Sequence, residues 1–429
     1  MFFIKNSTVV AVLSNRVNHS VIIRKAYRFR LKTNSEIEQM LWRFAGHCRF
    51  VWNYFWSLNQ SRLQNKQRVM RYAEMDYWSK LLKQSDEYGF LKEAPAHLIQ
   101  QKLRDLDRAY QDGFDRNQPN KRMPRKRKKF VHSSFRFPEP KQFKVENKRI
   151  WLPKLGWIRF FKSQEIKGSV QNVTLSYQAG CWYVSIQVEM ETVQQKPECS
   201  TAVGIDLGIA QLATVASNDG CVKIYAPRNS FKHYQAHLAR AQRKFTRKQK
   251  FSKNWSKQKH RIQKCHARIA NIRKDHLHRI SHEVCKNHAE IYVEDLKVVN
   301  MMHSARGTVA EPGRNVRAKS GLNRAIHDQG WSELRRQLEY KSSWRGGVVI
   351  AMNPRYTSQR CSHCGRTAAD NRTTQSQFFC QACGFAMNAD ANAARNILAA
   401  GLCRDGLWIE SYQGSEAETC GKARAATTL

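Results

Sequence analysis

The chain has 429 residues, and its 74 lysines and arginines against 34 aspartates and glutamates give a net charge of +40 at pH 7. That length allows several domains with cores of their own, and so large a positive charge favours a polyanionic partner, with nucleic acid the first expectation. A basic membrane-surface protein is the alternative, but no basic anchor helix stands out and no apolar run reaches the ~20 residues of a membrane span.

The first twenty residues are weakly apolar and are interrupted by Lys5, Asn6 and Arg16, so they lack the layout of a signal peptide. We expect a disordered leader at residues 1–20, or a start codon set too early. Most of the 12 cysteines are scattered along the chain. Without an export signal, we expect reduced thiols and a cytoplasmic protein.

Residues 21–32 alternate between apolar side chains and Arg or Lys, which predicts a half-buried strand with a basic outer face. From Ser35 to about Phe114 the apolar residues recur at spacings of three and four, which predicts helices. Aromatic residues in this stretch either stack on bases or pack in a helical core, and the core interpretation is favoured. They are Trp42, Phe50, Trp52, Tyr54 and Trp56.

The charge run at residues 120–129, broken by Pro124, cannot form a core and is either a solvated linker or a phosphate-binding arm. In a chain this basic we favour the arm. Its candidate nucleic-acid contacts are Arg125, Lys126, Arg127 and Lys128.

Strand patterns follow between residues 125 and 195, and two of them flank a turn at Ala179 and Gly180. They predict a small antiparallel β-barrel. The strand at residues 21–32 is expected to complete this barrel, with the helices as an insertion.

Beyond a polar linker near residue 195, strands alternate with helices, which is typical of an α/β core. Buried strands are predicted in TAVGIDLGIAQLATVAS and AEIYVEDL, a further strand in GVVIAMNP, and a helix in WSELRRQLEYKSSWRG. A long pair of helices dense in Lys and Arg is predicted from Phe231 to His288. Its candidate nucleic-acid contacts are Arg243, Lys244, Arg247 and Lys248.

Two Cys-x-x-Cys pairs near the C-terminus, Cys361 with Cys364 and Cys380 with Cys383, form the strongest motif. Four soft thiolates select tetrahedral Zn²⁺, and a glycine follows each pair, as a tight knuckle requires. A redox pair is the alternative. The spacing favours one zinc, and four ligands leave no open position, so we expect the zinc to be structural.

Three carboxylates lie at the ends of predicted elements: Asp206 and Glu294 on buried strands, and Asp390 at a helix start. Each has an ordinary explanation, since Asp390 alone fits a helix N-cap and Glu294 fits an ion pair. Taken together in a strongly cationic protein, they are better explained as ligands of Mg²⁺, which prefers hard oxygen donors and bridges to phosphate.

Segments that carry these features resemble, in chain order, the TnpB (OrfB) proteins of bacterial insertion sequences. They are GIDLG, QRKFTRKQKFSKNWSKQKHRI, HARIANIRKDHLHRIS, YVEDLKVVNM, NPRYTSQRCSHCG and DANAARNI, and the resemblance covers about residues 21–400. One departure is visible: many relatives have an acidic residue where this chain has Asn388, but the acid that aligns with the catalytic one, Asp390, is kept.

The resemblance implies an RNA-guided DNA endonuclease related to the type V CRISPR effectors. Its acidic triad corresponds to Asp206, Glu294 and Asp390, with two catalytic Mg²⁺ or Mn²⁺ ions. The implied partners are a guide RNA from the transposon end and double-stranded target DNA with a short adjacent motif. We expect one protein copy per RNA, no membrane, and a place at the nucleoid of a prokaryotic cytoplasm.

The implied fold is multidomain α+β, with a wedge-type β-barrel that carries an inserted helical recognition domain. A RuvC-like (RNase H fold) nuclease with an inserted zinc ribbon follows. The expected limits are 1–20 for the leader, 21–34 and 119–198 for the barrel, 35–118 for the recognition domain, 199–354 and 387–402 for the nuclease, 355–386 for the ribbon and 403–429 for a disordered tail.

Two alternatives belong to other functional classes. A guided DNA-binding repressor without cleavage should lack acids of the triad, and all three are present. A transposase, or an accessory transposition protein, would use the same fold, but the motifs favour guided cleavage.

Overall fold

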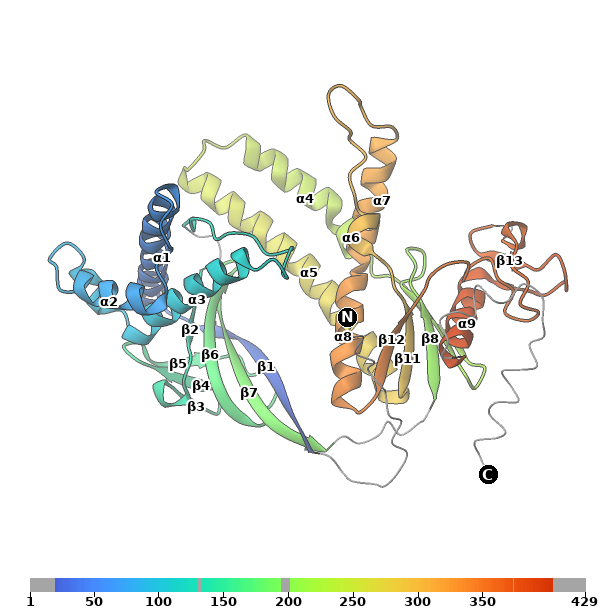
Figure 1. Ribbon diagram of the computed structural model, residues 1–429, viewed down its shortest axis with the longest axis horizontal. Coiled ribbons are helices and arrows are strands. Elements are labelled where there is room, and N and C mark those ends of the chain that lie inside the picture. Colours follow the sequence, from blue (N-terminus) through green and yellow to red (C-terminus); the bar gives the residue numbers. More distant parts are fainter. Residues whose placement is uncertain (1–19, 130–132, 194–200, 373, 404–429) are drawn as a thin grey trace, which may run out of the picture. The chain divides into compact units, whose positions relative to one another are not determined.

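The computed structural model describes residues 20–129, 133–193, 201–372 and 374–403 (Figure 1). The chain divides into two compact units, residues 22–191 and a second unit that contains residues 192–429. Nearly all of the expected leader (1–20) and tail (403–429) lies outside the described residues. No helix in the described part of the chain is long and apolar enough to cross a membrane.

Seven strands of the first unit form one sheet in the order β2-β6-β7-β1-β5-β4-β3. Strand β1, predicted from its alternating pattern, lies between β7 and β5 and so joins strands far along the chain, as expected. The turn at Ala179 and Gly180 joins β6 to β7, and both residues have positive φ. The strands are β1 (Ser20–Lys32), β2 (Ser134–Phe137), β3 (Lys144–Glu146), β4 (Arg149–Leu152), β5 (Gly156–Phe160), β6 (Ser169–Gln178) and β7 (Cys181–Val193).

Helices α1 (Ser35–Gln64), α2 (Tyr72–Leu82) and α3 (Ala96–Phe114) occupy the stretch between β1 and β2, as the periodicity predicted. Their apolar faces share one core with the sheet. The aromatic residues of α1 belong to this core: Trp52 is buried, and Trp42, Phe50, Tyr54 and Trp56 pack against it. The core interpretation of these side chains is therefore confirmed.

The second unit contains a five-stranded sheet in the order β10-β9-β8-β11-β12. Strands β8, β9 and β10 are antiparallel neighbours, whereas β8, β11 and β12 run parallel. The α/β character of this unit is therefore as predicted, although β10 had not been anticipated. The strands are β8 (Ala202–Asp206), β9 (Ala213–Ser217), β10 (Val222–Tyr225), β11 (Glu290–Glu294) and β12 (Val348–Met352).

Helices cover both faces of this sheet. Residues Val203 and Ile205 of β8 pack in one core with α5 and α8, whereas Ala202 of β8 and Tyr292 of β11 pack with α9. Figure 1 shows α4 and α5 as a long hairpin that projects from the sheet. The helices are α4 (Ser230–Thr246), α5 (Lys253–Asn287), α6 (Val298–Met301), α7 (Val316–Gln329), α8 (Trp331–Trp344) and α9 (Ala389–Leu402). Helix α7 had not been predicted.

A small hairpin of β13 (Gln377–Phe379) and β14 (Ala386–Asn388) lies in the chain between β12 and α9. Cys361, Phe378, Cys380 and Ala389 form its own minor core. A segment with so small a core depends on another constraint for stability, and the paired cysteines offer one.

Candidate metal sites and basic surfaces

The alternation of the strands brings Asp206 and Glu294 to the same face of the sheet. They are the last residues of the parallel neighbours β8 and β11, and Ile205 pairs with Val293 just before them. Because side chains alternate along a strand, both acids lie on the face that α9 covers. Asp390 is in the first turn of α9, and its charge, like that of Glu294, acts on Asp206. Among the described residues, the carboxylate oxygens of these acids do not gather as closely as the four cysteine sulfurs do.

Two glycines allow α9 to lie directly on the strands. A β-carbon at Gly204 of β8 would overlap with the carbonyl oxygen of Ala394 and the amide nitrogen of Leu398. On α9 itself, a β-carbon at Gly401 would overlap with the ring of Tyr292 on β11. This close approach holds the start of α9, and with it Asp390, beside the carboxyl ends of the strands.

Each of the three carboxyl groups has a raised pKa. Burial, with the charges of Glu294 and Asp390, raises the pKa of Asp206 to about 8, although the cation of Arg372 opposes this. Burial also raises the pKa of Glu294 and of Asp390. The cluster therefore lacks positive charge, and a bound divalent cation would stabilise all three ionised carboxylates.

Two residues at this cluster were not identified from the sequence. The hydroxyl of Thr357 donates a hydrogen bond of 2.8 Å to Glu294 Oε1 and lowers the pKa that burial raises. Arg372 lowers the pKa of Asp206 and Asp390. A single threonine or arginine in a loop gives no periodic signal, so only the structure could identify them. Glu294 also lines a cavity of about 290 Å³ beside α8, which none of the other residues of the cluster lines.

The N-cap of α9 is Asn388 and not Asp390. Asn388 Oδ1 accepts hydrogen bonds from the amides of Asp390 and Ala391 at 3.0 and 3.2 Å. The N-cap explanation of Asp390 is therefore wrong, and its carboxylate is available to the cluster. Asparagine is among the best N-cap residues, which suits Asn388 to this position.

The four paired cysteines form a site that is already compact. Their Sγ atoms all lie within 4.8 Å of one another, with 3.7 Å between Cys361 and Cys383 and 3.6 Å between Cys364 and Cys380. Four sulfurs around zinc at a Zn–S distance of ~2.3 Å would be about 3.8 Å apart. Among the described residues, no other group of His, Cys, Asp or Glu gathers in this way.

The two knuckles have matching backbone geometry. Gly365 and Gly384 have φ values of +81° and +68°, and their amides bond to the carbonyl oxygens of Cys361 and Cys380 at 3.0 and 2.9 Å. Burial raises the pKa of Cys361, and backbone N–H groups that bond to its thiol oppose this; similar bonds help to lower the pKa of Cys380 to about 7 despite burial. Such donors stabilise thiolates, so the residues present fit a thiolate-bound zinc ion.

Side chains of α9 hold the segment that leads into the ribbon. Asn392 accepts from the amide of Ser362 at 2.9 Å and donates to the carbonyl of Arg360 at 2.7 Å. Asn396, one turn further on, donates to the carbonyls of Thr357 and Arg360 at 2.8 and 2.7 Å. Helix α9 therefore helps to position both the cysteine site and the carboxylate cluster.

The basic run near residue 125 is held against helix α1 by hydrogen bonds. Trp52 and Trp56 of α1 donate ring N–H bonds to the carbonyls of Arg125 and Pro124 at 3.0 and 2.8 Å. The guanidinium of Arg127 lies 3.7 Å from the ring centroid of Trp52 and is half-buried. Of the four predicted contacts, Arg125, Lys126 and Lys128 are exposed to a partner, and Arg127 has a packing role.

All four predicted contacts of the helical pair are exposed near the end of the α4–α5 hairpin, where the chain leaves α4. Arg243 and Lys244 are in the last turn of α4, and Arg247 and Lys248 follow it. Burial of Asp328 fixes the other end of α4, because its carboxylate accepts from the amides of Phe231 and Lys232. The hairpin is thus anchored to α7 at its base.

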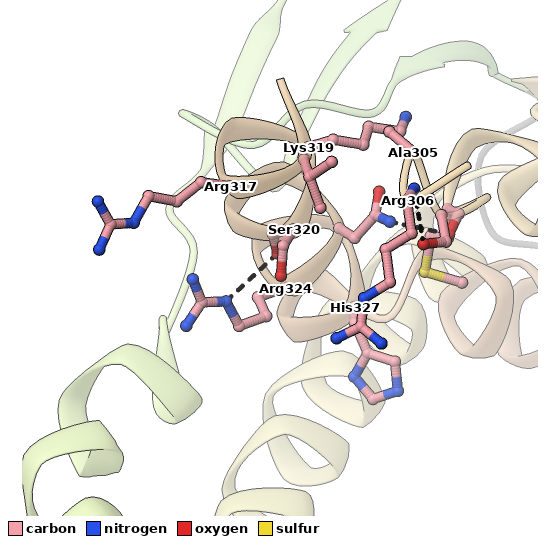
Figure 2. A pocket seen from close by; sticks show the side chains of 11 residues that line it. Ala305, Arg306, Arg317, Lys319, Ser320, Arg324 and His327 are labelled. Carbon is pink, nitrogen blue, oxygen red and sulfur yellow. Dashed lines mark hydrogen bonds between the residues drawn. The ribbon is translucent and has the colours of Figure 1, made fainter. Parts of the chain in front are cut away.

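A basic cavity lies beside α7. It has a volume of about 730 Å³ and is lined by the α7 residues Arg317, Lys319, Arg324 and His327, together with Arg306 from the preceding loop. Figure 2 shows Arg317 and Arg324 extending from the same side of the helix. None of the three arginines has a carboxylate partner among the described residues, so they are available to bind anions.

One cysteine departs from the expectation of reduced thiols. Nine described cysteines are free, but Cys403, just after α9, is disulfide-bonded. The expectation from scattered cysteines is therefore wrong for this residue.

Profiles of three families match the chain. "Probable transposase" (OrfB_IS605) matches residues 185–305, "Cas12f1-like, TNB domain" matches 331–397, and "Helix-turn-helix domain" (HTH_OrfB_IS605) matches 23–68. Together they span parts of both units.

Similar proteins extend over most of the chain. The "Putative RNA-guided DNA endonuclease InsQ" of Escherichia coli (strain K12) is 49% identical over 377 residues, which cover 88% of this chain and 92% of that protein. A "Putative RNA-guided DNA endonuclease" of Streptomyces pristinaespiralis is 30% identical over 394 residues, or 90% and 92% of the two chains. Among solved structures, a Cas12f1-sgRNA-target DNA complex matches 88% of this chain and 98% of its own with a TM-score of 0.52 at 11% identity, which indicates a similar fold.

Proposed function

We infer that this chain, which belongs to the TnpB (OrfB) family, is an RNA-guided DNA endonuclease of an insertion sequence. Family membership rests on the 49% identity that extends through 88% of the chain. The convergence of Asp206, Glu294 and Asp390 carries the proposed chemistry, which is metal-dependent hydrolysis of a phosphodiester bond in target DNA.

Hard carboxylate oxygens suit Mg²⁺ or Mn²⁺, and two such ions would stabilise the charge that develops during in-line attack on a phosphodiester. Asp206 interacts with both other acids and is the natural shared ligand. Thr357 orients Glu294 through its hydroxyl. Arg372, whose positive charge lowers the pKa of Asp206, would attract the phosphate of a bound strand.

We assign residues 199–354 and 387–402 to a RuvC-like (RNase H fold) nuclease domain. The mixed sheet, with three antiparallel strands beside two parallel ones, supports this assignment. Residues 355–386 would be a zinc ribbon with one structural ion, which the sulfur geometry supports. Residues 21–34 and 119–198 would be the wedge-type barrel around a recognition domain at 35–118.

The proposed partners are a guide RNA made from the transposon end and double-stranded DNA with a short adjacent motif. The name of the solved complex includes an RNA and a target DNA, and the net charge of +40 suits both. Exposed cations near residue 125, at the α4–α5 hairpin and beside α7 provide phosphate contacts. We expect one protein copy per RNA, near the nucleoid of a bacterial cytoplasm.

A guided repressor and a transposase are the other candidates. A repressor does not need three acids with raised pKa values in one place, because such a cluster lowers stability without contributing to binding. A transposase would join strands as well as cut them.

Guided cleavage of a DNA target, with RNA that copurifies with the full chain, tests the proposal. Asp206→Ala should abolish cleavage but keep RNA and target binding, because the basic surfaces are unchanged. Asp295→Ala, which alters the exposed neighbour of Glu294, is the matched control and should still cut. Cleavage by Asp206→Ala near the parent rate would refute the site, and joined strands in place of cut ends would favour a transposase.

A further inference from the structure

The tip of the α4–α5 hairpin exposes a large aromatic side chain. Helix α4 ends at Thr246 and α5 begins at Lys253, and Phe251 lies in the turn between them with 79% of its surface exposed. Its φ is +68°, in the left-handed region that residues with a β-carbon seldom adopt. Ser252 Oγ caps α5 by accepting from the amide of Trp255 at 3.1 Å, which fixes the turn just after Phe251.

Phe251 is part of an aromatic cluster and not a single exposed ring. Its ring centroid is 5.6 Å from that of Trp255, which in turn is 4.9 Å from Phe245 at the end of α4. Phe245 and Trp255 are partly buried between the helices, and Trp255 packs against the ring of Phe251. We call these three residues the aromatic tip.

Cations surround the aromatic tip. Lys250 lies 5.7 Å from the ring centroid of Phe251, and Lys259 lies 5.2 Å from that of Trp255. Arg247, Lys248 and Lys253 are exposed on the same turn and have no carboxylate partner in the described part of the chain. A π-face framed by unpaired cations is the combination that single-stranded nucleic acids bind, with bases on the ring and phosphates on the cations.

Folding alone does not account for Phe251. An exposed ring gains little from the hydrophobic effect, and a glycine would accept this φ without the strain that a side chain brings. A residue that is unfavourable on both counts suggests a role for the ring in binding a partner.

We propose that the aromatic tip is a base-stacking site for an unpaired nucleotide of the guide RNA, with Phe251 against the base. RNA is favoured over DNA because folded RNA keeps loops and bulges whose bases are unstacked, whereas the bases of duplex DNA are paired and stacked. The proposal rests on the proposed function, which supplies the RNA partner. It adds a site that does not touch the DNA-cutting carboxylates.

Binding of the full-length protein to an RNA stem-loop tests the site. The loop consists of unpaired adenosines, one of them replaced by 2-aminopurine, whose fluorescence falls on stacking. A blunt RNA duplex of the same stem and a DNA stem-loop of the same sequence are the comparison probes. Phe251→Gly should weaken binding to the RNA stem-loop by about 5-fold to 100-fold, the range for loss of one base–aromatic contact.

The same variant should melt within a few degrees of the parent, because glycine relieves the positive φ but loses the ring contact with Trp255 and is freer in the unfolded chain. Loss of affinity without a matching loss of stability separates a binding role from a structural one. Phe251→Trp keeps a ring and should bind within a few-fold of the parent with the same quenching. Lys250→Ala, the charge control, should weaken stem-loop and duplex alike and lower the salt dependence by about one phosphate contact.

Parent-level binding of the RNA stem-loop by Phe251→Gly, or an equal loss on stem-loop and duplex, would overturn the proposal. An equal loss on the DNA stem-loop would assign the site to single-stranded DNA and overturn the choice of RNA. The cleavage test stays separate. If Asp206→Ala abolishes guided cutting while Phe251→Gly binds RNA normally, the proposed function stands and only the aromatic tip fails.

Discussion

The four cysteines come from one short segment, with their sulfurs within 4.8 Å of one another, whereas the three carboxylates meet only where two strands and a helix converge. Protonated thiols are neutral and can crowd together without a metal. Ionised carboxylates repel one another, and burial adds to the cost, as the pKa of Asp206 at about 8 reflects.

The cysteine site and the carboxylate cluster should therefore have opposite effects on the stability of the protein. A metal at the cysteine site would hold together a segment with almost no core of its own. The carboxylate cluster lowers the stability of the metal-free protein, and the well-packed sheet and α9 compensate for it. The following predictions test this contrast in order of expected effect.

Loss of the cysteine site should have the largest effect, because structural zinc binding contributes apparent free energies of about 10–16 kcal/mol in small zinc domains. The double variant Cys361→Ser, Cys380→Ser should fall from about one zinc per chain to almost none. Hydrogen exchange should lose protection in residues 355–386, while β8 and β11 keep theirs.

Cys221→Ser is the matched control, because Cys221 is an exposed free cysteine outside the knuckles, and its zinc content should not change. Full zinc content in the double variant would refute the site. Simultaneous loss of protection in β8 and β11 would show that the two sites do not fold separately.

Removal of the central acid should stabilise the protein without magnesium. Between about pH 4 and pH 8, folded Asp206 holds a proton that the unfolded chain releases, so the free energy of unfolding falls as pH rises through this window. Asp206→Asn removes this dependence. Its stability advantage should be near zero at pH 4 and reach a few kcal/mol above pH 8.

Thermal melts without added magnesium, and without a chelator that would also remove zinc, measure this advantage. Added Mg²⁺ should stabilise the parent more than Asp206→Asn, so that the parent then melts at the higher temperature of the two. Asp295→Asn is the control, since exposed Asp295 pairs with Arg335 and its loss should not stabilise. If the parent is at least as stable as Asp206→Asn at pH 8 without magnesium, the carboxylate cluster does not lower the stability of the metal-free protein.

The smallest effect is expected at Thr357. Thr357→Val removes the hydroxyl that bonds to Glu294 at 2.8 Å, so the pKa of Glu294 should rise further and its carboxylate should bind metal less well. A lost hydrogen bond of ~1 kcal/mol corresponds to about fivefold more Mg²⁺ for half-maximal cleavage. Thr357→Ser keeps the hydroxyl and should behave like the parent. An unchanged magnesium requirement in Thr357→Val would leave Thr357 a purely structural role.

The sequence by itself determined the elements that depend on near neighbours. The two knuckles follow from the spacing of Cys361 to Cys364 and of Cys380 to Cys383, with a glycine after each pair. Their backbone bonds span only a few residues. Alternation likewise predicted β1, and short apolar runs predicted the buried strands β8 and β11, because these patterns are local to each strand.

The tertiary structure alone decided which residues meet across long separations. Sequence patterns cannot set the pairing of β8 with β11, the close approach of Gly204 to α9, or the bond from Thr357 to Glu294, since each joins residues far apart in the chain. The same holds for Arg127, an expected phosphate contact that Trp52 holds in a packed position. Local chemistry specifies such side chains, but only the packing of strands and helices over the whole unit brings them together.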